Sequence, residues 1–204
     1  MKNNEVFDTI EKIQAAKKEL EVQALSVETL SASGAEQLAA EKARLVQLAK
    51  VTKLKRLKKI KDLPDSALLL IAEHGKIEEI ENFASYALDK VAKFAGFIAG
   101  TDSFSESSNV TGIVTFNFLY QNIDRVIRTG ENTSNLLSKC SIEPSTAGSQ
   151  SSNSLKALLA LNAVECYGVG KYKLIKNSFF TKALRERLPE SSNRSSMKKL
   201  ISNA

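Results

Sequence analysis

The sequence predicts an all-α fold, in which a long N-terminal helical hairpin packs on a bundle of shorter helices. Apolar residues recur at three- and four-residue spacing over long stretches, which is typical of amphipathic helices. Only three prolines and nine glycines occur among 204 residues, fewer than a many-turned β-sandwich needs. Because 43% of the residues are hydrophobic and 25% are charged, the chain can bury a core without disulfides or metals. The length suits one ordinary domain or two small ones.

Residues 1–62 are expected to form the long hairpin, with a basic end. The first helix is predicted over residues 5–30, with Lys17 interrupting its apolar seam. Ser33 and Glu36 have the spacing of a capping box, so the second helix should begin near Gly34 and continue to residue 61. The long seams indicate that some apolar surface is buried between subunits, and we therefore expect a homo-oligomer.

Residues 63–140 are expected to form a central helical bundle. Pro64 suits the first turn of a short buried helix, and Gly75 suits its C-terminal cap. The stretch 76–99 has the most regular apolar seam in the chain and predicts one helix. Residues 110–130 begin with β-branched and aromatic residues, but the helical period of the second half favours a helix over most of this stretch.

The C-terminal third divides into a linker, a helical pair and a tail. Residues 141–154 are rich in serine and predict a flexible linker. Residues 155–204 are expected to hold two helices, joined at residues 168–170, and a polar tail.

The most unusual feature is the segment at residues 50–61, where seven of the twelve residues are basic and none is acidic. Its apolar residues recur every three positions, so on an α-helix their stripe would wind around the axis. The cations between them must then project outward, and they have no acidic partner at four-residue spacing. Lysine outnumbers arginine, which fits diffuse attraction to phosphate better than recognition of bases. The predicted phosphate-binding residues of this segment are Lys50, Lys53, Lys55, Arg56, Lys58, Lys59 and Lys61.

A second candidate site is the sequence YGVGKYK at residues 167–173. A turn containing two glycines before a helix can direct backbone N–H groups at a phosphate, and Lys171, Lys173 and Lys176 would add positive charge. The stretch resembles the turn of helix-hairpin-helix DNA-binding modules, with Tyr167 standing where a proline is expected. The alternative is a tight turn between helices that simply needs glycine.

Other kinds of site have weaker support. A helix-turn-helix around His74 and Gly75 is disfavoured, because the helix that follows begins with acidic residues that would repel DNA. His74 is the only histidine, and no nucleophile–base pair or nucleotide-binding loop occurs, so we expect a non-enzymatic protein without cofactors. Cys140 and Cys166 lack the spacing of metal ligands and are expected to be reduced, buried residues in a cytoplasmic protein.

The net charge of +6 and the isoelectric point near 9.2 favour an anionic partner. The prediction is a self-associating protein of a nucleocapsid-like kind that binds DNA or RNA through phosphate contacts. One alternative is a structural or adaptor protein whose basic segment docks on an acidic protein. A weaker one is a peripheral membrane protein, in which the amphipathic helix carrying Lys90 and Lys93 lies on a lipid surface. No segment is apolar enough to be an integral membrane span.

Overall fold

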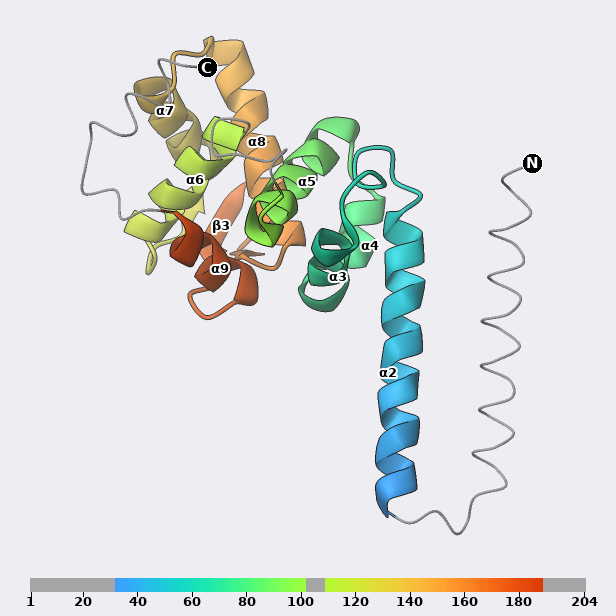
Figure 1. Cartoon of the computed structure of the whole chain (residues 1–204). Coiled ribbons are helices and arrows are strands. Elements are labelled where there is room, and N and C mark those ends of the chain that lie inside the picture. Colours follow the sequence, from blue (N-terminus) through green and yellow to red (C-terminus); the bar gives the residue numbers. More distant parts are fainter. Residues whose placement is uncertain (1–31, 102–108, 189–204) are drawn as a thin grey trace. The chain divides into compact units, whose positions relative to one another are not determined.

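The computed structural model describes residues 32–101 and 109–188, which form eight helices and one three-stranded sheet (Figure 1). This part of the chain is mostly helical, with helices packed on helices, as the sequence predicts. The chain divides into two compact units, residues 1–49 and 50–204. The division therefore falls before the basic segment, whereas the expected hairpin ended at residue 62.

The described part of the first unit is the N-terminal portion of α2 (Ala32–Leu54). The chain is already helical at Ala32, the first described residue, so Ser33 lies within the described helix. Val46 and Leu48 are 56% and 45% exposed on it. The helix predicted over residues 5–30 lies outside the described residues.

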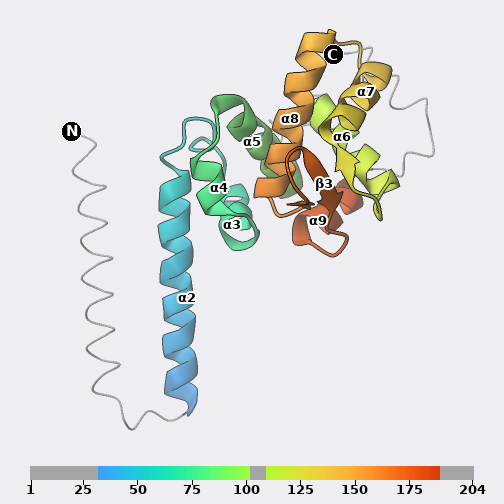
Figure 2. The same cartoon turned by 180° about the vertical axis from the view of Figure 1, so that it is seen from behind.

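The second unit is built around α8 (Pro144–Ala160). This helix lies between α5 (Ser85–Ala99) on one side and α6 (Val110–Gln121) and α7 (Thr129–Lys139) on the other (Figures 1 and 2). α3 (Asp65–His74), α4 (Ile77–Glu81) and α9 (Phe179–Arg187) complete the helices. The largest fully buried side chains include Phe94, Phe116 and Phe180, from α5, α6 and α9. Apolar faces at helical spacing thus meet in one core.

The sheet corrects the prediction for the C-terminal helical pair. β2 (Val164–Cys166) and β3 (Lys171–Leu174) form an antiparallel hairpin, and β1 (Ile127–Arg128) pairs with the other edge of β3. The residues predicted as a turn between helices are the hairpin turn, where Gly168 and Gly170 have φ values of 120° and 67°. Tyr172 and Leu174 are buried while Lys171 is exposed, and this alternation is the two-residue period of a strand.

The predicted linker at residues 141–154 was also wrong, because α8 begins at Pro144 and continues through the serine-rich stretch. Pro144 suits a first helical position, and Ala147, Ser151 and Leu155 recur every four residues and are fully buried. The buried Ser151 hydroxyl donates to the backbone oxygen of Thr129 at 3.1 Å and accepts from the side chain of Asn132 at 2.9 Å. Satisfied hydroxyl groups allow serine inside a packed helix.

Two predicted helices are shorter than expected. The helix predicted over residues 76–99 is divided into α4 and α5, which are separated by residues 82–84. The helix predicted over most of 110–130 ends at Gln121, where the side chain of Asn122 donates to the backbone oxygen of Phe118 at 2.9 Å. Asparagine side chains compete with the backbone for such bonds and favour helix ends.

Candidate nucleic-acid interface

The basic segment does not stay helical to residue 61 as predicted, because α2 ends at Leu54. Beyond it the backbone forms successive tight turns, in which Leu57, Ile60 and Leu63 donate to carbonyls three residues earlier at 2.9–3.0 Å. In turns of this kind the side chains at i and i+3 lie on the same side. The three-residue apolar spacing, which would wind around an α-helix, therefore stays on one side here.

This spacing divides residues 54–63, hereafter the basic turns, into anchors and outward positions. Leu54 and Ile60 are fully buried, Leu63 is 5% exposed and Leu57 is half-buried, so all four anchor the backbone to the core. Two outward residues lie between each pair of anchors, and all six of these are exposed: Lys55, Arg56, Lys58, Lys59, Lys61 and Asp62. The core contacts of the anchors thus hold the cations at the surface.

Three of the predicted phosphate-binding residues already have partners in the second unit. The Lys50 ammonium donates to the backbone oxygen of Ala72 at 3.1 Å, near the C-terminal end of α3. Lys53 lies 3.7 Å from Glu81, and Lys55 lies 2.9 Å from Asp65. Both ion pairs are largely exposed and stabilise the fold by at most about 1 kcal/mol, so water and salt compete with them.

Four predicted residues remain exposed and unpaired with any residue that the structure describes: Arg56, Lys58, Lys59 and Lys61. The seven cations of residues 50–61 and the two carboxylates of Asp62 and Asp65 leave residues 50–65 with a net charge of +5. Glu81, which pairs with Lys53, lowers this excess to +4, so these neighbouring carboxylates do not neutralise the surface.

The second predicted cluster lies on and beside the sheet. Lys171 and Lys173 are on β3, and Lys176 lies in the turn that follows it. The hairpin does not lead into a helix, so the proposed phosphate site at a helix N-terminus was wrong. The N–H of Lys171 is occupied by the backbone oxygen of Gly168 at 3.0 Å.

The structure adds one cation that sequence reasoning missed. Arg128 lies on β1 directly opposite Lys171, and both side chains are exposed. The two residues are 43 positions apart, and the register of β1 with β3 alone brings them together. An arginine that ends a two-residue strand leaves no local pattern by which it could have been found.

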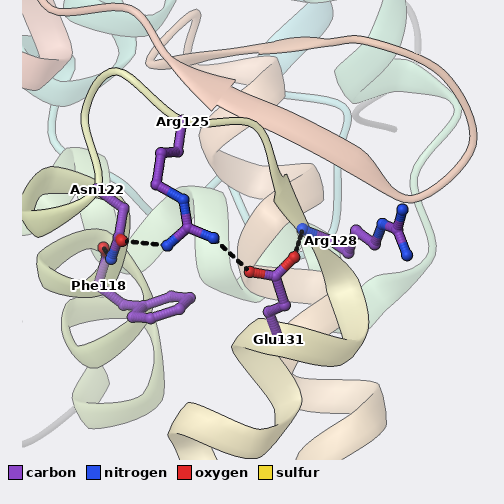
Figure 3. Close-up of polar contacts among 5 residues, drawn as sticks. All are labelled: Phe118, Asn122, Arg125, Arg128 and Glu131. Atoms are coloured by element: carbon purple, nitrogen blue, oxygen red, sulfur yellow. Dashed lines mark hydrogen bonds and ion pairs between the residues drawn. The ribbon is translucent and has the colours of Figure 1, made fainter.

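Glu131 does not neutralise Arg128 (Figure 3). One Glu131 oxygen accepts the backbone N–H of Arg128 at 3.3 Å, and the other lies 3.5 Å from the guanidinium of Arg125. That guanidinium also donates to Asn122 at 2.9 Å. The Arg128 side chain extends away from this network, so its charge remains available at the surface.

The two cationic clusters form separate surfaces of the second unit. Both views place the residues that follow α2 beside α4, and β3 on the other side of α5 (Figures 1 and 2). A ligand therefore meets the basic turns and the sheet as two sites.

The other residues considered in the sequence analysis are His74 and the two cysteines. His74 stacks on Phe179 with the ring centroids 3.9 Å apart, which is packing between α3 and α9. The turn after His74 leads into α4, whose five residues are too few for a recognition helix. Cys140 is buried as expected, but Cys166, which ends β2, is exposed.

Lys90, on the amphipathic helix of the membrane-surface alternative, is only 7% exposed. Within the described ranges no helix has the length and apolarity to cross a bilayer, and no group of side chains could hold a metal ion. Comparison with protein-family models, with curated proteins and with solved structures found no match.

Proposed function

We propose that this protein is a non-enzymatic nucleic-acid-binding protein that holds the phosphate backbone through its basic turns. The single observation that carries the proposal is the repeat of residues 54–63, in which buried anchors alternate with pairs of exposed residues, five of the six cationic. Lysine and arginine attract phosphate without a fixed geometry, so sequence-independent binding needs nothing more elaborate.

Rigid display favours this role over that of a merely solvated charged loop. Leu54 and Ile60 are fully buried, so the backbone between them is fixed before any ligand arrives. The entropy lost on binding then comes mainly from ordering side chains, because the backbone is already ordered. Each phosphate contact also releases condensed counterions from the nucleic acid, which is favourable at low salt.

Self-association is the second part of the proposal. α2 has 23 residues and carries the exposed apolar residue Val46 on its surface. Exposed apolar side chains on a long helix are buried when a second helix packs beside it. Light scattering should give a mass that is a multiple of 22.3 kDa, and a monomer at all concentrations would contradict this part.

The binding test compares two variants that have lost the same charge. The basic-turn variant replaces Arg56, Lys58, Lys59 and Lys61 with glutamine, and the charge-matched variant replaces Lys42, Lys76, Lys93 and Lys182 with glutamine. At low salt the basic-turn variant should bind random-sequence nucleic acid at least about tenfold more weakly than the charge-matched variant.

Equal affinities of the two variants would contradict the proposal. No binding by the unmodified protein at low salt would also contradict it. The alternative function, in which the basic turns dock on an acidic protein, would then be favoured.

A further inference from the structure

The region from α6 to β3 has the connectivity of a helix-turn-helix followed by a hairpin. α7 and α8 pack against each other and are joined by the four residues 140–143. Val114 on α6, Leu136 on α7 and Ala147 on α8 form a small core beneath this turn. Asn132 on α7 donates to Thr115 on α6 at 3.0 Å and to Ser151 on α8 at 2.9 Å, so buried polar contacts link all three helices. In DNA-binding proteins with this connectivity the second helix of the pair enters the major groove.

The outer surface of α8 is compatible with that role. Ser145, Ser149, Ser152 and Lys156 occupy positions i, i+4, i+7 and i+11, which lie on one side of a helix. No acidic residue occurs between Pro144 and Ala160, and hydroxyl groups can bond both phosphates and base edges. The C-terminal end of this side borders a pocket of about 670 Å³ lined by Glu78 and Glu79, so contact with DNA is expected near the N-terminal half of α8.

The exposed face of the sheet supplies the observation that indicates an anionic ligand. Arg128 stands directly opposite Lys171, and Lys173 is two residues further along β3. Like charges in directly opposed positions destabilise a sheet. The carboxylate on this face is Glu165, opposite Lys173, and it accepts the hydroxyl hydrogen of Tyr167 at 2.8 Å. A bound phosphate would relieve the repulsion between Arg128 and Lys171, which no carboxylate of the described residues does.

We propose that α6–α8 and the three-stranded sheet form a winged helix-turn-helix that binds duplex DNA. The outer side of α8 faces a groove, and Arg128, Lys171 and Lys173 hold phosphates. The inference deepens the proposed function and rests on it for the nature of the ligand, but it uses a different surface. Single-stranded nucleic acid fits less well, since platforms for single strands present several aromatic rings and this face of the sheet presents only Tyr167 among the described residues.

Fluorescence anisotropy with a random-sequence DNA duplex and with one of its single strands tests this inference. The sheet variant replaces Arg128, Lys171 and Lys173 with glutamine, and its control replaces Lys42, Lys76 and Lys93. We expect the unmodified protein to prefer the duplex, and the sheet variant to bind the duplex about tenfold more weakly than its control. Ser149→Glu should also weaken duplex binding about tenfold, while Ser149→Ala should change it less than about twofold.

The outcomes separate the two proposals. Loss of binding in the basic-turn variant alone would overturn the winged helix-turn-helix and leave the proposed function in place. Loss in the sheet variant and in Ser149→Glu alone would support the winged helix-turn-helix and contradict the role of the basic turns. Equal affinity for duplex and single strand, with no effect of Ser149→Glu, would also overturn this inference. Circular dichroism of each variant verifies that the helices are intact.

Discussion

The ammonium group of Lys90 lies 3.0 Å from Asn109 Oδ1 and 2.6 Å from Thr111 Oγ1, and it joins the middle of α5 to the start of α6. Both partners are neutral. Burial, followed by the neighbouring Lys93, lowers the pKa of Lys90 from 10.5 to about 8, although Asp89 and Cys140 oppose this shift. The fold therefore disfavours the charged form of this side chain.

The first prediction concerns pH. The folded state releases the Lys90 proton at a lower pH than the unfolded state, so between pH 8 and 10.5 the unfolded chain holds more protons. The free energy of unfolding should thus gain about 2 kcal/mol from this group between pH 8 and pH 10.

Urea denaturation of the wild type and of Lys90→Met at both pH values isolates that contribution. Other groups titrate in both proteins, so their effects cancel in the difference. The stability of the wild type relative to Lys90→Met should rise with pH. A difference that is constant, or that falls with pH, would show that Lys90 is not perturbed in this direction.

A second prediction compares two glycines inside helices. A Cβ added to Gly112 in α6 would lie 2.7 Å from Asn109 Cγ, and Asn109 holds Lys90. A Cβ added to Gly148 in α8 meets nothing within 4 Å. Gly112→Ala should therefore cost about 1–3 kcal/mol of unfolding free energy, because the buried bond to Lys90 is lost. Gly148→Ala should gain about 0.5–1 kcal/mol from helix propensity.

Thermal or urea unfolding followed by circular dichroism distinguishes the two alanine variants. The order of stability should be Gly148→Ala, wild type, Gly112→Ala. If Gly112→Ala were as stable as the wild type, the hydrogen bond between Asn109 and Lys90 would not contribute to the free energy of unfolding.

A third prediction concerns the anchors of the basic turns. Ile60 is fully buried, whereas Leu57 is only half-buried. Ile60→Ala should lower the unfolding free energy by about 2–4 kcal/mol, and Leu57→Ala should lower it by clearly less. The amide hydrogens of residues 55–63 should also exchange faster in Ile60→Ala, because the anchor that holds these turns is removed. Equal and small losses in both variants would mean that the turns are not anchored as described.

The sequence allowed prediction of the helical class, of the Pro64 and Gly75 boundaries of α3 and of the exposure of Arg56, Lys58, Lys59 and Lys61. These features depend on local spacing and composition. The three-residue apolar period of residues 54–63 was recognised, but its meaning was missed: in tight turns this period keeps apolar side chains on one side. For these residues the predicted helix was wrong, while the predicted exposure of the cations agrees with the structure.

The missed features depend on contacts between distant residues. The serine-rich start of α8 has the composition of a linker. It is part of the core because Ser151 forms hydrogen bonds with Thr129 and Asn132, which are distant in sequence. β2 and β3 are three and four residues long, too short for their alternation to outweigh the helical period around them. Arg128 joins Lys171 only through strand register, and the buried Lys90 meets Asn109 and Thr111, 19 and 21 residues further along the chain. No local pattern encodes these pairings.

The salt dependence of binding to a random-sequence DNA duplex tests the central claim most directly. The logarithm of the association constant should fall linearly with the logarithm of salt concentration, and the slope should become shallower by about 3 to 4 in the basic-turn variant, since each lost phosphate contact contributes about 0.9. The charge-matched variant should keep the slope of the wild type. A slope that is the same in the basic-turn variant and the wild type would contradict the claim that Arg56, Lys58, Lys59 and Lys61 contact phosphate.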